Sequence, residues 1–495
     1  MNWLLGPFFL YTLAFGGIVV PKLNLILSLI CRNYMSERSM KDPYFRMKPL
    51  VFAEDNPQCQ VPEVQAAVAR FTLYGNLVAG LLSAFISPKL GAFSDRHGRP
   101  RVMAFTVAGS FLSEILNIMA ATYPGMFNVN WLLLGYAMEG ICGSFIAAMA
   151  LTNAYASDTT PPSKRAVTFA YIHGVLFGGI ALGPLVAGFV IKATGTVLSI
   201  FYIALACHCI FFLFLAFIVP ESLTKERQLI ARSKHEYVGS DPAPSSRDWR
   251  FYLKGNAILG PLSVLWPTGP DTSPALRQNL ALLAAVDTCM FGVAMGGMTV
   301  IIIYSEFMFG WGNFESSIFV SIVNICRVTV LMALLPLFSR VLRGPAHKIR
   351  NRDQSGSDSA DLLIIRTAIF FDMLGYIGYA TVRVGPLFIL SGALASIGGM
   401  GSPTLSSAMT KHVPPDRVGQ MLGAMGLLHA LARVVAPTVF NAIYSVTVGK
   451  FTQTVFVCLA GTFGFAFVLS WGIRAGVHWD EDQRPQEERR EEGGD

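Results

Sequence analysis

Eleven ionisable side chains stand inside apolar stretches that are long enough to cross a lipid bilayer. Placing a charge in hydrocarbon costs free energy, so such residues are by default functional, as proton carriers, substrate ligands or ion-pair partners. A structural ion pair explains Arg366 with Asp372 equally well. The eleven residues are Lys22, Glu114, Glu139, His173, His208, Asp287, Arg327, Arg366, Asp372, His429 and Arg433.

Seven of these residues form the set that we predict for proton coupling and a substrate cavity. Glu139 stands near the middle of its apolar stretch and is the best candidate for a carboxylate that binds and releases a proton. Asp287 and Arg327 are expected to pair, and His429 and Arg433 share one helix face because they are four residues apart. The predicted set is Glu139, Glu114, His173, Asp287, Arg327, His429 and Arg433.

A short polar stretch, residues 91–101, separates two apolar runs and carries one Asp and three Arg. Open backbone groups and unpaired charges are costly in hydrocarbon, so we expect a cytoplasmic hairpin here. Its glycines permit a tight turn and close helix approach, and its charged side chains can pair with a helix end, acidic partners or lipid phosphates. The residues concerned are Gly91, Asp95, Arg96, Gly98, Arg99 and Arg101.

Small residues recur at four-residue spacing in the fifth apolar stretch. Such spacing lets two membrane helices approach closely, and a proline within the helix permits bending. The predicted packing motif comprises Gly179, Gly183, Pro184 and Gly188. Ordinary membrane helix packing explains it almost as well as a role in transport direction.

Composition places these stretches in an all-α membrane protein. The 495 residues are 53% hydrophobic and only 14% charged, with a mean hydropathy of +0.50, whereas soluble proteins carry about a quarter charged residues. We predict twelve transmembrane helices in two six-helix bundles. The expected spans are residues 3–31, 64–87, 101–122, 131–154, 169–191, 197–219, 280–304, 318–338, 362–382, 387–409, 418–444 and 455–472.

Basic residues set the expected orientation. They gather in the short loops after the second and eighth spans, and basic loops stay on the cytoplasmic side, so both termini are expected to be cytoplasmic. The first span is expected to break at Pro21–Lys22, and residues 32–63 to form a polar loop. The expected division is an N-terminal bundle over 1–222, a cytoplasmic linker over 223–276, a C-terminal bundle over 277–476 and a charged cytoplasmic tail over 477–495.

An internal repeat supports two related halves. Pro161–Pro162 is followed 22 residues after its second proline by Pro184, and Pro414–Pro415 is followed at the same interval by Pro437. Duplicated bundles around a central site are the arrangement that transporters use for alternating access.

The stretch from Gly91 has the form Gly-x-x-x-Asp-Arg-x-Gly-Arg, which resembles the signature loop of major facilitator superfamily transporters. The resemblance implies the twelve-helix fold and a latch that stabilises one access state, although Pro100 stands where the family usually has a basic residue. The fifth span resembles a motif of proton-coupled exporters. Three further stretches resemble a fungal branch related to tetracycline exporters and proton-coupled folate-type carriers; they are residues 31–34, 56–65 and 157–162.

These features together predict a proton-coupled secondary transporter that exports small amphipathic compounds, a drug or a secondary metabolite. The alternative is proton-coupled import of an organic anion, with Arg327 or Arg433 binding its carboxylate. The expected partners are a small-molecule substrate, protons and the lipid bilayer, with no nucleic acid and no cofactor, and the expected state is a monomer in the plasma membrane or the vacuolar membrane. No nucleotide loop, nucleophile–base set or metal-ligand spacing appears, so an enzyme or an ATP-driven pump is disfavoured.

Two of the eight cysteines differ from the others because they are expected to face the exoplasmic side. A disulfide between Cys31 and Cys59 can form in an oxidising compartment, and the sequence leaves open whether it does.

Overall fold

The computed structural model describes residues 2–41, 59, 61–239, 260–268, 272–311, 313–343 and 356–477. Its secondary structure over these ranges is entirely helical, as the composition predicts. Residues 478–495 of the predicted tail and residues 344–355 of the predicted basic loop after the eighth span lie outside the described residues. So do residues 240–259 and 269–271 of the predicted linker.

The helices of the N-terminal half keep the predicted order, but several extend further than expected. They are α1 (Asn2–Gly17), α2 (Val19–Lys41), α3 (Pro62–His97), α4 (Arg99–Thr122), α5 (Trp131–Ile141), α6 (Ser144–Thr159), α7 (Arg165–Thr194) and α8 (Leu198–Leu213), which continues as a π-helical turn, η3 (Phe214–Ile218). The predicted polar loop beginning at Arg32 is wrong, because α2 continues to Lys41. The first span breaks at Ile18 and not at Pro21, which lies in the first turn of α2, where its missing N–H has no helical partner to lose.

The second half begins after the linker helix α9 (Lys225–Gly239) and a short turn, η4 (Gly260–Leu265). Its helices are α12 (Pro274–Phe309), α13 (Asn313–Thr329), the π-helical turn η5 (Val330–Leu334), α14 (Leu335–Arg343), α15 (Ser359–Thr381), α16 (Gly385–Ala395), the 3₁₀ turn η7 (Ser396–Met400), α17 (Gly401–Lys411), α18 (Val418–Thr447) and α19 (Thr454–Trp471).

The repeat around the two proline pairs appears as matching elements. Each pair is followed by a 3₁₀ turn, η2 (Pro162–Lys164) or η8 (Pro415–Arg417), and then by a helix of 30 residues that contains the later proline. The helices before the two pairs are also alike, because each is interrupted near its middle: α5 and α6 by the left-handed Gly143, α16 and α17 by η7. The two halves therefore share their element order.

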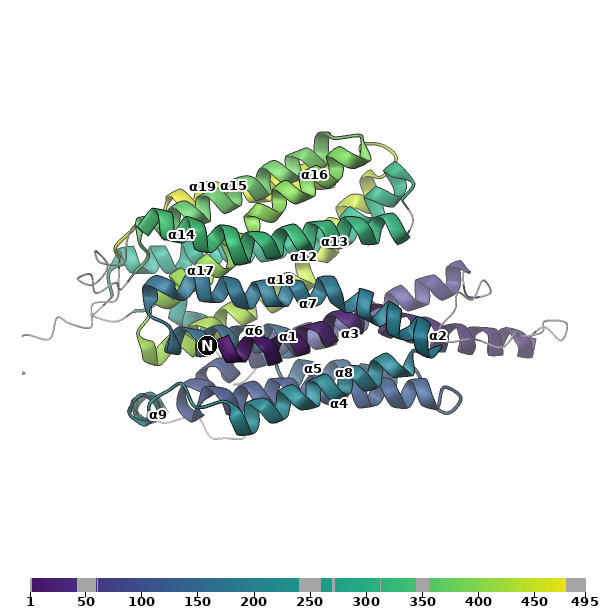
Figure 1. Ribbon diagram of the computed structural model, residues 1–495, viewed down its shortest axis with the longest axis horizontal. Helices are drawn as coiled ribbons and strands as arrows, with labels where there is room; N and C mark the ends of the chain where they lie inside the picture. Colours follow the sequence, from purple (N-terminus) through teal and green to yellow (C-terminus); the bar gives the residue numbers. More distant parts are fainter. Residues whose placement is uncertain are drawn as a thin grey trace, which may run out of the picture.

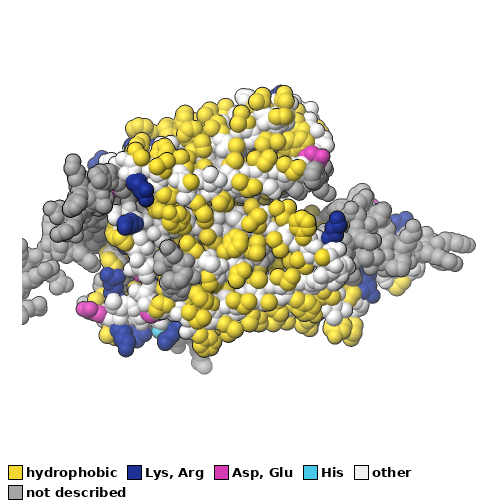
Figure 2. Space-filling view, viewed as in Figure 1, with side chains coloured by type: hydrophobic (Ala, Val, Ile, Leu, Met, Phe, Trp, Pro, Cys, Tyr) yellow, Lys and Arg dark blue, Asp and Glu magenta, His cyan; other side chains and the backbone are white. Residues whose placement is uncertain are grey.

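Eleven helical stretches in the described residues are long and apolar enough to cross a membrane. Helix α15, which corresponds to the predicted ninth span, is not among them. Figure 2 shows a broad hydrophobic surface over the middle of the bundle, with Lys and Arg gathered toward its two ends. The surface fits a bilayer-embedded bundle; the twelve-span count and the cytoplasmic position of both termini stay predictions.

The two halves lie one above the other in Figure 1, with α7 and α18 running between them. Helix α18 of the second half packs along α3 and also against α6, while α7 of the first half packs against α13 and α17. Each half thus contributes one long, proline-containing helix, α7 or α18, to the interface. The N-terminus of α1 lies at the end of the bundle that also carries α9 and α14.

Candidate functional site

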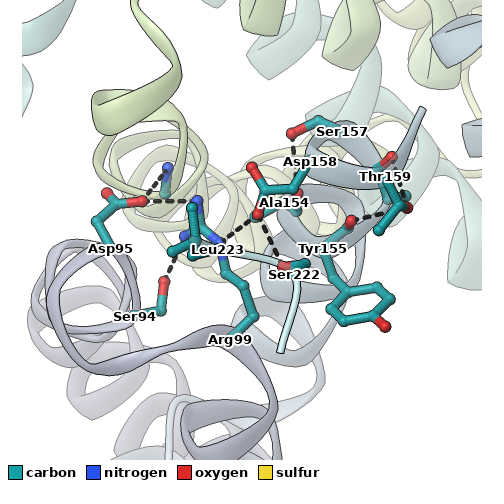
Figure 3. A network of polar contacts seen from close by, with 12 residues as sticks. Ser94, Asp95, Arg99, Ala154, Tyr155, Ser157, Asp158, Thr159, Ser222 and Leu223 are labelled. Carbon is teal, nitrogen blue, oxygen red and sulfur yellow. Dashed lines mark hydrogen bonds and ion pairs between the residues drawn. The ribbon is translucent and has the colours of Figure 1, made fainter. Parts of the chain in front are cut away.

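A network of buried polar contacts occupies the end of the bundle where α3 meets α4 (Figure 3). Its centre is Arg99, whose side chain is fully buried. Arg99 Nη2 lies 2.6 Å from Asp95 Oδ1, its Nε donates to Asp158 Oδ2 at 2.9 Å, and its Nη1 donates to Ser94 Oγ at 2.6 Å. One guanidinium therefore joins α3, α4 and α6. We call Ser94, Asp95, Arg99 and Asp158 the latch.

The latch also reaches the other half of the molecule. Asp95 Oδ1 accepts a hydrogen bond from the backbone N–H of Gly419 at 3.0 Å, and its Oδ2 accepts one from the backbone N–H of Gln420 at 2.8 Å. These amides belong to the first turn of α18, where backbone N–H groups lack helical partners and the helix dipole attracts an anion. The carboxylate of Asp95 thus fastens α3 to α18 across the interface.

Two glycines make this geometry possible. A Cβ at Gly91 would overlap the carbonyl oxygen of Gly419, so only glycine lets α3 and α18 approach this closely. Gly98 has φ +102° and a Cβ there would overlap the carboxylate of Glu221, which accepts a hydrogen bond from the Arg99 amide at 2.9 Å. Both positions therefore need the smallest residue.

The prediction of a hairpin over residues 91–101 is wrong in extent. Helix α3 continues to His97 and α4 begins at Arg99, which leaves Gly98 as the single non-helical residue. The polar residues remain helical because their side chains pair with α4, α6 and α18. Arg96 and Arg101 do not join the latch: Arg96 Nε donates to the Ala92 carbonyl at 3.1 Å, and Arg101 is exposed.

A second contact joins the halves at the same end. Arg165, the first residue of α7, donates from Nη1 to the Thr410 carbonyl at 3.2 Å near the end of α17. The neighbouring Lys411 forms a buried ion pair with Asp361 at the start of α15. Lys411 stands three residues before Pro414 as Asp158 stands three before Pro161, so the second half repeats the Arg99–Asp158 pair with the charges exchanged. The repeat carried this signal, and the sequence reasoning missed it.

Deeper in the first half, Lys22, Glu114 and Glu139 form a cluster from α2, α4 and α5. Lys22 interacts electrostatically with both carboxylates, and its Nζ lies 4.1 Å from the centre of the Tyr136 ring. Glu114 is 2% exposed and accepts a hydrogen bond from Asn117 Nδ2 at 3.3 Å, while Lys22 and Glu139 are half-buried. The structure therefore brings two of the predicted residues together around a lysine that was noted among the ionisable residues and left out of the predicted set.

Arg433 connects this cluster to the second half. It lies on α18, is half-buried, and interacts electrostatically with Lys22. The predicted shared face of His429 and Arg433 places both side chains on the interface side of α18, each facing a different group of charges. We call Lys22, Glu114, Glu139 and Arg433 the interface charge cluster.

His429 belongs to a second group, and it corrects a prediction. Its Nε2 lies 2.8 Å from Asp287 Oδ2, so Asp287 pairs with His429 and the predicted pair with Arg327 is wrong. The reason is tertiary: α12, which carries Asp287, packs along α18. His173 on α7 interacts electrostatically with both Asp287 and His429. Its Nδ1 donates a hydrogen bond to the Phe169 carbonyl at 2.9 Å. This group again spans both halves.

Arg327 lies in a third group, with Asp372 of α15. The two interact electrostatically, and the Arg327 guanidinium lies 4.9 Å from the centre of the Phe177 ring on α7. A Cβ at Gly398 would overlap the Asp372 carboxylate, and one at Gly399 would come 2.9 Å from Arg327 Cγ. The two adjacent glycines of η7 therefore make room for the pair.

The expected pair of Arg366 with Asp372 is also wrong. Arg366 lies over the Trp471 ring at 4.3 Å and donates to the Ser470 carbonyl at 3.3 Å. A spacing of six residues puts two side chains on different faces of a helix, so each finds a partner on another element. Sequence spacing alone excluded this pair.

Comparison with known proteins identifies the chain. The family model described as Major Facilitator Superfamily matches residues 64–350. The chain is 32% identical to the MFS-type transporter avaJ of Aspergillus versicolor, over 95% of this chain and 88% of the relative. The chain belongs to the Major Facilitator Superfamily. Its resemblance to that family's signature stretch is thereby confirmed, and the protein is a membrane transporter and not an enzyme.

Each of the two functional hypotheses, import and export, has a more distant relative among known transporters. The proton-coupled folate transporter of Rattus norvegicus is 22% identical over 83% of this chain and 78% of its own length. The class C tetracycline resistance protein of Escherichia coli is 27% identical over 75% of this chain and 80% of its own length. Among solved structures, the human organic anion transporter MFSD10 covers 94% of this chain and 97% of its own, with 19% identity and a TM-score of 0.67. That likeness supports the fold.

In this transporter, two of the three glycines in the predicted packing motif of the fifth span lie directly against another helix. A Cβ at Gly179 would come 2.5 Å from the Thr12 backbone, and one at Gly183 would come 2.7 Å from the Leu13 carbonyl, so α7 and α1 touch through both. Nothing lies within 4 Å of a Cβ at Gly188, so that position does not pack against another element. Pro184 lies within the unbroken α7.

Cys31 of α2 and Cys59, just before α3, form a disulfide, so the alternative that the sequence left open is resolved in the structure. Both cysteines are buried in a hydrophobic cluster with Leu29, Met35 and Val64. The bond ties the far end of the first span to the start of α3.

Proposed function

We propose that this protein is a proton-coupled secondary active transporter that exports small amphipathic compounds across the plasma membrane by alternating access, as a monomer. The vacuolar membrane is the alternative location. The observation that carries the proposal is the interface charge cluster, in which Lys22 of the first half interacts with two carboxylates of that half and with Arg433 of the second half. Charges are retained inside membrane bundles mainly where they move protons or bind substrate.

The charge count of the cluster supplies a coupling mechanism. Lys22, Glu114 and Glu139 carry a net charge of −1 when all are ionised, and Arg433 makes the set neutral while the halves are together. When the halves rotate apart and Arg433 withdraws, one proton on a carboxylate restores neutrality in the low-dielectric interior. Glu139 is the carboxylate assigned to this role because it is half-buried and more accessible to water than Glu114.

The contacts at the latch end supply the second element of alternating access. Asp95 with the backbone amides of α18 and Arg165 with Thr410 join the two halves at the latch end of the bundle. A state joined at that end gives access from the opposite side. On the predicted orientation the latch end is cytoplasmic, so the joined state is open to the outside, and the proton that replaces Arg433 enters from that side as the latch end begins to open.

Export is favoured by the likeness to a tetracycline resistance protein and by the resemblance of the fifth span to that of proton-coupled exporters. The second candidate is proton-coupled import of an organic anion. It is favoured by the likeness to a proton-coupled folate transporter and to an organic anion transporter, and by the presence of Arg327 and Arg433 in the half-buried interior. An arginine can hold a carboxylate through two parallel hydrogen bonds.

Growth of cells on a panel of toxic amphiphiles separates the two candidates. Cells that lack the protein are compared with cells that over-express it or over-express Glu139→Gln. Export predicts that tolerance rises with expression of the native protein and not with expression of the variant. Sensitivity that rises with expression would contradict export and support import through the arginines.

A further inference from the structure

A groove of about 990 Å³ lies on the outer side of α3 and α4 at the latch end of the bundle. Its wall is apolar, and three of the wall residues, Phe93, Phe105 and Ile141, are each close to 45% exposed. The apolar lining residues are Ile86, Leu90, Phe93, Val102, Phe105 and Ile141.

Basic side chains line the groove, three of them where α3 ends and α4 begins. They are Lys89, Arg96, His97 and Arg101, and none of the lining residues is acidic. Within the described residues, no carboxylate lies at ion-pair distance from Lys89, Arg96 or Arg101. Lys89 rests over the Phe85 ring at 3.7 Å, and His97 stacks on Phe93 at 4.0 Å, so these groups are held in place by neighbouring rings. Arg96 interacts electrostatically with Asp95 of the latch, but the lining carries a net positive charge that no lining carboxylate offsets.

Charge and apolar surface are ordered along the helices. Arg96, His97 and Arg101 lie where α3 ends and α4 begins, while Ile86, Phe105 and Ile141 lie deeper in the bundle. From His97 to Ile86 the groove follows α3 for about 16 Å at 1.5 Å per residue. A ligand that fits has an anionic head at the membrane surface and a hydrocarbon chain that runs inward.

We propose that this groove binds an anionic phospholipid of the bilayer, with its phosphate held by Arg96 and Arg101, Lys89 adding positive charge two turns deeper on α3, and an acyl chain along Phe93 and Phe105. On the predicted orientation the lipid comes from the cytoplasmic leaflet, which carries the anionic lipids. The proposal goes beyond transport and holds for either direction of it.

The bound lipid would also touch the contact between the two halves. Gln420 of α18 lines the same groove, and its backbone N–H donates to Asp95 in the latch contact. A headgroup seated there bridges α3 and α4 of the first half with α18 of the second. The lipid is therefore expected to stabilise the state in which the latch end is closed.

Native mass spectrometry of the full-length protein tests the binding. Wild type is titrated with phosphatidylserine and with phosphatidylcholine of identical acyl chains, and is expected to retain phosphatidylserine more tightly. The double variant Lys89→Gln/Arg101→Gln is expected to lose this preference, by about fivefold in affinity for each charge removed. The control, Lys192→Gln/Arg383→Gln, removes two exposed charges at the opposite end of the bundle and should keep it.

Two further arms identify the occupant. Soluble glycerophosphoserine, which lacks acyl chains, should not displace the lipid, and Phe105→Ala should weaken retention of both lipids while keeping the preference. Equal retention of the two lipids by wild type would overturn the proposal. So would an unchanged preference in Lys89→Gln/Arg101→Gln.

Hydrogen exchange measures the effect on the latch contact. In nanodiscs, phosphatidylserine is expected to slow amide exchange over residues 415–424 relative to phosphatidylcholine alone, in wild type and in the control variant. The difference should vanish in Lys89→Gln/Arg101→Gln. A lipid-dependent slowing that persists in that variant would contradict binding in this groove.

Discussion

At the scale of single residues, the latch depends on one arginine and the carboxylates around it. Arg99 is buried without solvent contact, and its guanidinium forms ion pairs with both Asp95 and Asp158. Asp95 has a second role, because the same carboxylate accepts two amides of α18. Buried charges that lose a partner are costly, so Asp95 couples the stability of the first half to closure against the second.

Replacement of Asp95 by Asn tests this coupling. Asn retains one acceptor oxygen but loses the charge, so the contact with α18 should weaken by about 1.5–3 kcal/mol, the range for a hydrogen bond to a charged group. Amide exchange over residues 415–424 should become faster. Glu63→Gln, an exposed change at the other end of α3, is the matched control; equal exchange in both variants would remove Asp95 from the latch.

At the scale of elements, α7 shows how small residues set helix distance. Gly183 and Gly188 lie five residues apart on one helix, but only Gly183 touches α1. Gly183→Ala should destabilise the protein by about 1–3 kcal/mol through overpacking. Gly188→Ala should be neutral or stabilising, since alanine is favoured over glycine within a helix. Thermal unfolding of the two variants in detergent compares them, and equal melting temperatures would contradict the α1–α7 contact.

The disulfide joins Cys31 of α2 to Cys59, just before α3. Closing a loop between Cys31 and Cys59 restricts the unfolded chain, which typically stabilises a protein by roughly 2–4 kcal/mol. Cys31→Ser should therefore lower the melting temperature, and reducing agent should lower that of wild type by a similar amount. Cys458→Ser removes a free cysteine of α19 and is the control. A melting temperature insensitive to Cys31→Ser would contradict the assignment.

At the scale of the whole molecule, the features predicted correctly from the sequence are those that hydropathy and internal repeats determine. The apolar runs located the helices and the proline pairs located matching elements. Hydropathy marks only the part of a helix that is in hydrocarbon, so it missed the extension of α2 to Lys41 and the helical state of residues 91–97. Partners across the bundle were missed for another reason. Asp287 pairs with His429 because α12 lies along α18, and no spacing within one helix reveals that neighbour.

The same scale holds the central claim, that protons move through the interface charge cluster as the halves alternate. The most direct measurement uses proteoliposomes with an acidic interior and the compound to which expression confers tolerance. The wild-type protein, and Glu226→Gln as a control on the linker helix α9, should accumulate the compound against its gradient.

Glu139→Gln should abolish that accumulation while still allowing the compound to equilibrate down its own gradient. Uphill accumulation by Glu139→Gln at the wild-type level would contradict proton coupling through this cluster.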